Sequence, residues 1–440
     1  MRYLSKENLR LWRGKTALLR IDLNIEAGSK NYFRIDAVLP TMRLLLKNGV
    51  KIVILSHRGR PFLKSKIPAR NVSPARNAVS TAGWHSDAGG KNQNVNLSLR
   101  SFNQILAKKL KNKIIFIYDI EDTVKLRKEI NASKTKLFLL ENLRFWPGEE
   151  TNSPVFAKKL AILGDFYVND AFPVSHRANA SVSAVTRFIP SYAGVQFEKE
   201  IKNLHGALKN FKPPLVFILG GAKTFDKLGI LKFFKNKADK FLLGGGPATT
   251  FFAAEGLPVG DSVVDKSQIS KIKSQKYLGL KKIILPVDTI IEKKKILDIG
   301  PKTAKIYSDI IKHSKTIVWS GPMGFFENKR FAGGTKAIWE AIFYACENNN
   351  AKAVVGGGET VASLEATRGT TRKERGMTRK NFRGSQRKVS VSPRLFLSTG
   401  GGAMLDYLAG EKLPGIEALK TISISTIVKN DIIPKIKKYE

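Results

Sequence analysis

Short apolar runs alternate with amphipathic stretches along the whole chain. Each run is rich in β-branched and aromatic residues, ends abruptly in Gly, His, Arg or Asn, and is followed by apolar residues at helical spacing. This alternation predicts β-strands joined by crossover helices, and therefore parallel sheets. The expected strands lie at 16–24, 51–57, 113–119, 136–142, 165–172, 214–221, 240–246, 282–288, 315–321, 351–358 and 394–402.

So many strands exceed what one sheet of this kind holds, so the pattern favours two doubly wound, Rossmann-like α/β domains. We expect a first domain at 1–196 and a second at 213–420. The segment between them, 197–212, has helical spacing that ends at Pro213 and Pro214, and it predicts a hinge helix joining the domains. An ordinary crossover helix would show the same periodicity, so both interpretations stay open.

Two stretches interrupt the alternation, at about 62–95 and 366–394. Both are rich in Ser, Gly, Asn, Thr and basic residues, and both lack periodicity, which is typical of inserted loops. The second insert could cover a site, bind a polyanion or stay passive in solvent, and the passive role is the simplest. The final residues, 421–440, form a C-terminal extension to which we assign no function.

The net charge raises the question of nucleic-acid binding. The 440 residues include 76 Lys and Arg against 36 Asp and Glu, a net charge of +40. A solvated Lys-rich surface explains most of this excess, and part of it lies in the two inserts, so nucleic acid is not the expected partner. A polyanion-binding (RNA-binding) protein on a degenerate enzyme scaffold remains the alternative hypothesis.

Cysteine content and hydropathy narrow the class of protein further. Cys346 is the only cysteine, which excludes a disulfide-framed scaffold and a cysteine zinc site. The first residues carry frequent charges, and no stretch reaches about 18 uncharged apolar residues. We therefore expect a soluble, cytoplasmic protein with no membrane association.

Cationic side chains gather where the strands of the first half end. In open α/β sheets ligands bind beyond the carboxyl ends of the strands, so these positions are candidates for a site. Arginine forks match carboxylate and phosphate oxygens, which suits a small polyanion bearing both groups. A single arginine here would be a surface residue, and the histidines could be structural, but the cations recur at four strand ends. The residues are Arg20, Asp22, Asn24, Arg34, His57, Arg60, Arg144, His176 and Arg177.

Glycines gather where the strands of the second half end, at 220–227, 244–250, 320–327, 356–360 and 398–403. Glycine lets the backbone approach a ligand, and the first amides of a following helix favour phosphate, so these turns predict a nucleotide site. Neither GxxxxGK[ST] nor GxGxxG is present, which disfavours a P-loop enzyme and a dinucleotide oxidoreductase.

A cationic half and an amide-lined half together favour phosphoryl transfer, which needs positioning and neutralisation of charge. Lys223 and Lys227, four residues apart at a helix start, would lie on one face near the transferring group. Two solvated lysines would give the same spacing.

The motifs carry a closer resemblance. In order, the chain contains RIDLN, SHRGRP, LLENLRFWPGEE, YVNDAF, SHRA, GGAKTFDKLG, LPVD, DIGPKT, WSGPMGFFE, GGGET and STGGGA. With these the sequence resembles the phosphoglycerate kinase family over nearly its whole length, apart from the inserts and the tail. The resemblance implies reversible, Mg²⁺-dependent transfer of a phosphoryl group from 1,3-bisphosphoglycerate to ADP in glycolysis. It also implies an N-terminal acid-binding domain, a C-terminal nucleotide domain, hinge closure and, we expect, a monomer.

The resemblance also implies a role for each matching residue. The acid substrate would be held by Asp22, Asn24, Arg34, His57, Arg60, Arg144 and Arg177. Arg34, Lys223 and Lys227 would be catalytic. The nucleotide would be held by Lys227, Glu327, Gly357, Gly358, Glu359 and Thr360, with Glu359 as the protein ligand of Mg²⁺.

Five residues depart from the family pattern. Glu359 stands where Asp is usual, Ser320 where Asn is usual, and Pro173 where Gly is usual. Asn179 replaces a frequent His, and Phe225 occupies a normally small site. None removes an arginine of the acid site or either lysine, so we expect an active enzyme with altered metal or nucleotide binding.

Overall fold

The computed structural model describes residues 1–25, 32–61, 97–364 and 392–420. The chain forms two compact units. Unit 1 comprises Met1–Glu198 together with the chain from Leu413 onward, and unit 2 comprises Lys199–Lys412. Both expected inserts and the expected C-terminal extension lie almost entirely outside the described residues.

Unit 1 is built on a parallel sheet of order β3-β4-β2-β1-β5-β6. Its strands are β1 (Thr16–Arg20), β2 (Lys51–Leu55), β3 (Ile114–Ile117), β4 (Leu137–Leu140), β5 (Phe166–Asn169) and β6 (Ser191–Ala193). Arg20 at the end of β1 is in register with Leu55 of β2 and with Asn169 of β5. The carboxyl ends of three central strands therefore meet at one edge.

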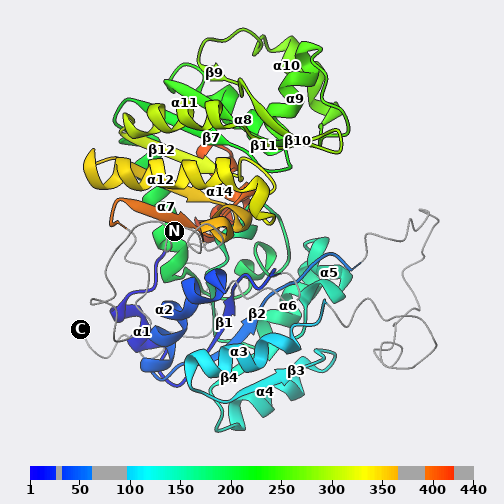
Figure 1. Cartoon of the computed structure of the whole chain (residues 1–440). Helices are drawn as coiled ribbons and strands as arrows, with labels where there is room; N and C mark the ends of the chain where they lie inside the picture. The colour runs from blue at the N-terminus through cyan, green and yellow to red at the C-terminus, as the bar shows by residue number, and fades with distance from the viewer. Residues whose placement is uncertain (26–31, 62–96, 365–391, 421–440) are drawn as a thin grey trace, which may run out of the picture. The chain divides into compact units, whose positions relative to one another are not determined.

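Helices cover this sheet because its strands are apolar on both faces. Ala17 and Leu19 of β1 belong to the core that includes residues of α2 and α3, whereas Leu18 points to the opposite face and is equally buried. Helices α2 and α3 lie next to each other (Figure 1). The α-helices described before α7 are α1 (Lys6–Leu11), α2 (Phe33–Lys47), α3 (Arg100–Leu110), α4 (Thr123–Ala132), α5 (Pro147–Glu150) and α6 (Pro154–Ile162).

Unit 2 holds a second parallel sheet, of order β14-β13-β12-β7-β8-β9, and a separate antiparallel pair β10-β11. The sheet strands are β7 (Leu215–Leu219), β8 (Lys240–Leu243), β9 (Ile283–Ile284), β12 (Thr316–Ser320), β13 (Lys352–Gly356) and β14 (Leu395–Ser398). The pair consists of β10 (Thr289–Glu292) and β11 (Lys295–Ile299).

The second sheet is also covered on both faces. Val216 and Ile218 of β7 share a core with α11 and α12. Phe217 between them points to the other face, where its ring stacks on Phe241 and contacts Phe234 at a tilt. The helices are α8 (Phe225–Phe234), α9 (Gly245–Glu255), α10 (Lys266–Ser274), α11 (Pro301–Lys312), α12 (Gly333–Asn348) and α14 (Gly402–Leu408). Residues 358–364, after β13, are helical as well.

The expected α/β class with two parallel sheets is confirmed, and a strand occurs within every range expected from the sequence. Three further strands were not expected. Strand β6 has only three residues, and β10 and β11 are joined by Lys293 and Lys294 at positive φ, where a hairpin usually has Gly or Asn. No apolar run or turn signal marked these elements.

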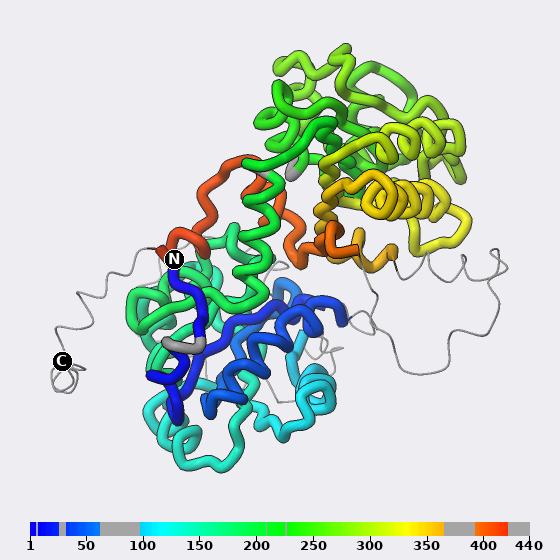
Figure 2. Tube along the Cα trace, turned by 90° about the vertical axis from the view of Figure 1, so that its left-hand side faces the viewer, coloured from blue at the N-terminus to red at the C-terminus, as the bar shows by residue number. Residues whose placement is uncertain are grey.

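The chain leaves unit 1 through α7 (Val195–Lys209) and returns to it with α15 (Pro414–Lys420), the red segment in Figure 2. Helix α15 packs on β6 and on the short 3-10 helix η5 (Ala184–Arg187), and the Gly415 N–H donates to the Ser175 carbonyl at 2.8 Å. Residues 413–420 therefore belong with unit 1, whereas the sequence placed them in the second domain.

None of the helices in the described parts of the chain combines the length and apolar character needed to cross a bilayer.

Candidate functional site

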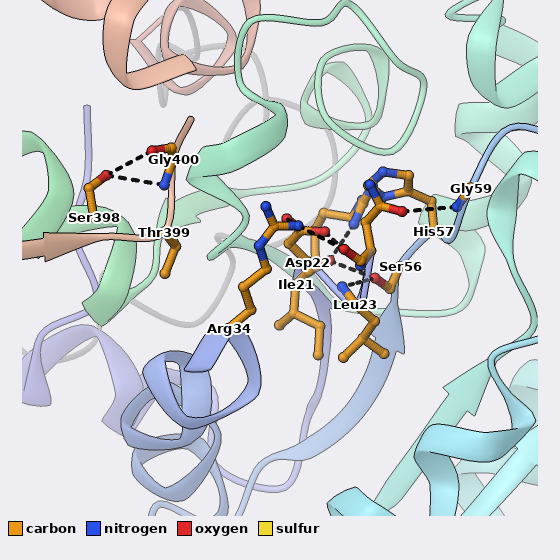
Figure 3. Close-up of polar contacts among 12 residues, drawn as sticks. Ile21, Asp22, Leu23, Arg34, Ser56, His57, Gly59, Ser398, Thr399 and Gly400 are labelled. Atoms are coloured by element: carbon orange, nitrogen blue, oxygen red, sulfur yellow. Dashed lines mark hydrogen bonds and ion pairs between the residues drawn. The ribbon is translucent and has the colours of Figure 1, made fainter. Parts of the chain in front are cut away.

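The carboxyl edge of the first sheet carries an ion pair between Asp22 and Arg34. Asp22 follows β1, and its Oδ2 lies 2.9 Å from Nη1 of Arg34 in the first turn of α2. The same Nη1 donates to the Asn24 carbonyl at 2.9 Å, and Asp22 Oδ1 accepts from the Asn24 N–H. Figure 3 shows the two charged side chains facing each other. The loop after β1 is thus shaped around Arg34.

Hydrogen bonds also join this loop to the loop after β2. The Oδ1 atom of Asn24 accepts from the Gly59 N–H at 2.9 Å, and Ser56 Oγ accepts from the Leu23 N–H while donating to the Ile21 carbonyl (Figure 3). Hydrogen bonds therefore hold the two predicted binding segments, RIDLN and SHRGRP, against each other at the carboxyl edge of the sheet.

His57, in the SHRGRP segment after β2, is buried, with 2% of its surface exposed. Burial lowers the pKa of His57 well below its usual 6.5, and the nearby charges of Arg20, Arg144, Arg177 and Arg34 lower it further. The imidazole is therefore neutral near pH 7. Arginines from β1, α2, η3 (Leu143–Phe145) and the segment after β5 therefore all act on one imidazole ring.

Arg144 approaches from the 3-10 helix η3 (Leu143–Phe145) that follows β4, and it is 3% exposed. Burial, and after it the charge of Arg177, lowers the pKa of Arg144 to about 10, with further lowering by Arg20 and Arg60. The Glu150 carboxylate opposes this shift from 3.2 Å. The buried Asn142 accepts from the Arg144 N–H and orients the turn.

The remaining predicted cations belong to the same group. Arg177 is half-buried after β5, and its Nε donates to Nε2 of His176 at 3.1 Å. Arg60 is exposed, yet close enough to act on Arg144. We call Arg20, Arg34, Arg60, Arg144 and Arg177 the arginine cluster. All five belong to unit 1 and adjoin the ends of its strands.

The carboxyl edge of the second sheet is built from glycine turns that contact one another. The Gly221 N–H donates to the Pro322 carbonyl at 2.7 Å, and the Gly246 N–H donates to the Gly221 carbonyl at 2.8 Å. A Cβ atom at Gly246 would lie 2.7 Å from the Ala222 carbonyl oxygen, so a larger residue cannot fit there without displacing the neighbouring turn. The turns after β7, β8 and β12, which are distant in sequence, thus pack directly against one another through their backbones.

The turn after β13 contacts the same group of turns. Gly321 donates to Oγ1 of the buried Thr360 at 2.8 Å, and Gly357 donates to the Gly400 carbonyl at 3.0 Å. Gly358 begins the helical stretch 358–364, and Glu359 beside it is exposed. Among the predicted nucleotide ligands, Thr360 therefore has a structural hydrogen bond, while Glu359 points to solvent.

The two lysines differ in their surroundings. Lys223 is exposed before α8, and Lys227, in the first turn of α8, is 8% exposed. Between them, Oγ1 of the buried Thr224 lies 3.0 Å from Oγ1 of Thr250 in α9. Glu327 is exposed in the segment after β12. The contact between Thr224 and Thr250 joins the start of α8 to α9.

A buried carboxylate on α7 holds the STGGGA turn. Glu200, fully buried, accepts from Ser398 Oγ at 2.6 Å and from both the N–H and the Oγ1 of Thr399 at 2.7 Å. Ser398 Oγ also contacts Gly400 (Figure 3). The half of α7 that belongs to unit 2 is thus tied to a strand end of that unit.

Three of the departures from the family pattern, Ser320, Pro173 and Asn179, have defined places in the fold. The Ser320 carbonyl accepts from Gly220, and Pro173 lies in the first turn of the 3-10 helix η4 (Phe172–Val174). Asn179 donates through its side chain to the Glu149 carbonyl at 3.2 Å. The side chain of Phe225 lies outside what the structure describes.

Several supporting residues were not predicted. Asn142, Glu149, Ser181 and Glu200 are buried and hydrogen-bonded to the site loops, but none is cationic, and only Asn142 stands at the end of an expected strand. The hydrogen bonds that Asn142 makes to Arg58, Glu149 to Ser181 and Glu200 to Thr399 join residues distant in sequence, so no local pattern marks them.

Comparisons with known proteins agree on one family. A family model described as phosphoglycerate kinase matches residues 7–411. The chain is 36% identical to the phosphoglycerate kinase of Trichodesmium erythraeum over 94% of this chain and 97% of that protein. It is 35% identical to that of Chloroflexus aggregans, over 93% and 97%.

Solved structures give the same result. The crystal structure of phosphoglycerate kinase from Pyrococcus horikoshii OT3 is similar with a TM-score of 0.71 and 29% identity, covering 96% of this chain and 98% of that one. The structure from Coxiella burnetii gives a TM-score of 0.65 at 29% identity, covering 95% and 99%. The residues matched by the family model include the strands of both sheets.

Proposed function

The chain belongs to the phosphoglycerate kinase family, and from this we propose that unit 1 binds the glycerate substrate and unit 2 the nucleotide. As a member, it is a phosphotransferase with a carboxyl group as acceptor. It moves a phosphoryl group reversibly between 1,3-bisphosphoglycerate and ADP, giving 3-phosphoglycerate and ATP, a step of glycolysis.

The arginine cluster around the neutral His57 is the observation that carries the assignment of the acid site. Burial lowers the pKa of both His57 and Arg144, and the charges of the neighbouring arginines lower it further, so positive charge is concentrated at this edge of the sheet. A substrate with a carboxyl and a phosphate group offsets that charge and matches the guanidinium forks. In the proposed site the substrate is held by Asp22, Asn24, Arg34, His57, Arg60, Arg144 and Arg177. Asp22 and Asn24 also orient Arg34.

The glycine turns support the nucleotide assignment. Backbone amides at the starts of α8, α9 and the 358–364 helix lie at one sheet edge, where they can face phosphate oxygens. We assign Lys227, Gly357, Gly358 and Thr360 to the nucleotide phosphates and Glu327 to the ribose hydroxyls. The Thr360 hydroxyl also accepts from the Gly321 N–H, so in this proposal Thr360 both contacts phosphate and holds the turn after β12.

Arg34, Lys223 and Lys227 are proposed to stabilise the transferring group. Phosphoryl transfer spreads negative charge over the equatorial oxygens, so nearby fixed cations lower the barrier. In-line transfer requires the two bound substrates to meet, and we propose that bending at the α7 hinge allows this.

The residues present fit Mg²⁺ as a cofactor. Among the described residues there is no group of three or more His, Cys, Asp or Glu that could hold a metal ion. In kinases Mg²⁺ is held by one or two carboxylates together with substrate phosphates, and an exposed Glu359 at the phosphate edge suits that arrangement. Bound there, the ion would neutralise phosphate charge.

Other expectations from the sequence complete the proposal. A monomer in the cytoplasm is consistent with a glycolytic enzyme. Polyanion binding through the basic inserts stays the second candidate, but those inserts lie outside the described residues, and no observation favours it.

Steady-state kinetics with 3-phosphoglycerate, ATP and Mg²⁺ test the proposal. We expect Arg34→Ala to lower kcat/KM for 3-phosphoglycerate by about 10²-fold or more, because a charge-assisted contact to the transferring group is lost. Lys227→Ala should lower kcat by a similar factor of about 10².

Matched controls come from the same helices. Arg43 in α2 and Lys232 in α8 are exposed, and their alanine variants should retain wild-type kinetics. Wild-type kinetics in Arg34→Ala or Lys227→Ala would contradict the site, and absence of turnover with salt-sensitive RNA binding would favour the second candidate.

A further inference from the structure

Arg20, at the end of β1, is not among the residues assigned to substrate. It is 1% exposed, and its guanidinium donates through Nε to Ser181 Oγ at 2.9 Å and through Nη2 to Nδ1 of His57 at 3.0 Å. A third contact reaches the Ile21 carbonyl. A buried guanidinium is tolerated when its donors are matched, so these contacts fix its plane.

The contact with His57 determines which ring nitrogen carries the hydrogen. Arginine has donors and no acceptor, so Nδ1 of His57 must be the acceptor. Because burial and the surrounding arginines lower the pKa of His57, the ring is neutral and has a single N–H. That hydrogen is therefore on Nε2.

Ser181 and Glu149 hold Arg20 in turn. The Ser181 hydroxyl donates to Glu149 Oε1 at 2.6 Å, and the Ser181 N–H donates to Glu149 Oε2 at 2.9 Å. With its only hydrogen committed to the carboxylate, Ser181 Oγ must present a lone pair to Arg20. Glu149, in α5, is 1% exposed and Ser181 is fully buried.

We propose that Glu149 and Ser181 are positioning residues that act through Arg20 to hold His57 as the Nε2–H tautomer, so that its ring donates to the oxygens of the acid substrate. The inference rests on the substrate contact of His57 in the proposed function. The opposite tautomer would present a lone pair to carboxylate or phosphate oxygens, which also carry lone pairs and would be repelled.

The carboxylates of the site differ in a way that supports this division of roles. Asp22 pairs directly with Arg34 and Glu150 with Arg144, and both arginines are assigned to substrate. Glu149 instead contacts Ser181, one step further from the substrate. Its charge offsets Arg20 without competing with an anion in the site.

Two variants test the clamp, which we define as Glu149, Ser181 and Arg20. Ser181→Ala removes the acceptor for Arg20 Nε. Glu149→Gln keeps the shape but leaves one acceptor oxygen where the Ser181 N–H and hydroxyl both need one. In both, Arg20 can turn from His57, so we expect the KM for 3-phosphoglycerate to rise about three- to tenfold while the KM for ATP is unchanged.

Controls separate the clamp from general damage. Ser191→Ala removes another buried hydroxyl of unit 1, which donates to the Ile189 carbonyl, and should leave both KM values unchanged. Ser181→Thr keeps the hydroxyl and should retain the wild-type tautomer. Circular dichroism verifies that each variant is folded.

Nitrogen NMR of ¹⁵N-histidine-labelled full-length protein reads the tautomer directly, and His57→Gln identifies the His57 signals. Wild type should show a pyridine-type Nδ1 and a pyrrole-type Nε2, whereas Ser181→Ala and Glu149→Gln should show averaged values for both nitrogens. Unchanged His57 signals in both variants would overturn the clamp, as would equal increases in both KM values.

The same data separate this inference from the proposed function. A wild-type KM for 3-phosphoglycerate in His57→Gln would remove His57 from the acid site, and with it the proposed purpose of the clamp. Raised acid KM in His57→Gln together with unchanged tautomers in the clamp variants would leave the proposed function in place and overturn the clamp alone.

Discussion

At the scale of single residues, Asp298 shows how burial decides the behaviour of a charge. Asp298 lies in β11 and has 1% of its surface exposed. Its carboxylate accepts from the Gly334 N–H at 2.8 Å and from the Ile299 N–H at 2.9 Å. Burial raises the pKa of Asp298 to about 7 from its usual 3.8, and these two hydrogen bonds only partly oppose the shift.

This shift predicts a pH dependence of stability. A raised pKa means that the folded state holds the proton more tightly, so the stability contributed below about pH 4 is lost as the pH rises towards 7. We expect Asp298→Asn to remove this loss. Between pH 5 and pH 8, the free energy of unfolding should fall less in the variant than in wild type, by about 2 kcal/mol.

Urea unfolding at the two pH values measures the effect. Asp239→Asn is a control in the same unit, because that carboxylate is exposed and accepts from the Leu215 N–H. Parallel pH profiles for wild type and Asp298→Asn would show that the Asp298 proton is not held in the folded state.

The charged residues at the strand ends could be predicted from the sequence, but the buried residues that hydrogen-bond to them could not. His57 and Arg144 follow from the rule that ligands bind beyond the carboxyl ends of parallel strands. Ser181 is 161 residues from Arg20, and Glu149 is 32 residues from Ser181, so only the folded chain reveals their contacts.

At the scale of elements, the strands of the two sheets other than β6 were predictable because each is a short run of mostly apolar residues. Their lengths were overestimated, since residues such as Asp22 and Asn24 continue the run in sequence but leave the ladder to form the site. The pair β10-β11 has exposed and half-buried residues and a lysine turn, so its sequence lacks both the apolar run and the turn signal.

The start of α9 gives a prediction at this scale. Gly246 donates to Gly221, and a Cβ atom there would collide with the Ala222 carbonyl at 2.7 Å. Gly246→Ala should push apart the turns after β7 and β8. We expect the KM for ATP to rise about tenfold or more, because the phosphate-facing amides move, while the KM for 3-phosphoglycerate is unchanged.

Gly229→Ala in α8 is the matched control. A Cβ at Gly229 would meet the Ala409 Cβ at an ordinary 3.7 Å, so alanine fits and should stabilise the helix by up to about 1 kcal/mol without changing either KM. A wild-type KM for ATP in Gly246→Ala would mean that this turn does not face the nucleotide.

At the scale of the whole molecule, two sources of positive charge must be separated: the arginine cluster and the overall net charge of +40. Only the cluster is aimed at a defined site. At about 0.15 M salt the Debye length is about 8 Å, so a distant charge contributes little to binding a small anion. The attraction of 3-phosphoglycerate should therefore depend on the cluster.

Salt dependence distinguishes the two sources. We expect the KM for 3-phosphoglycerate to rise with KCl, roughly tenfold between about 0.02 and 0.3 M, because screening weakens its attraction to the arginines. Deleting 368–392, which lie almost entirely outside the described residues, removes nine Lys and Arg and one Glu. This deletion should leave both the KM and its salt slope unchanged, whereas Arg60→Ala should flatten the slope. A flatter slope after the deletion would instead show that the insert attracts the substrate, and a KM independent of KCl would contradict an electrostatic acid site altogether.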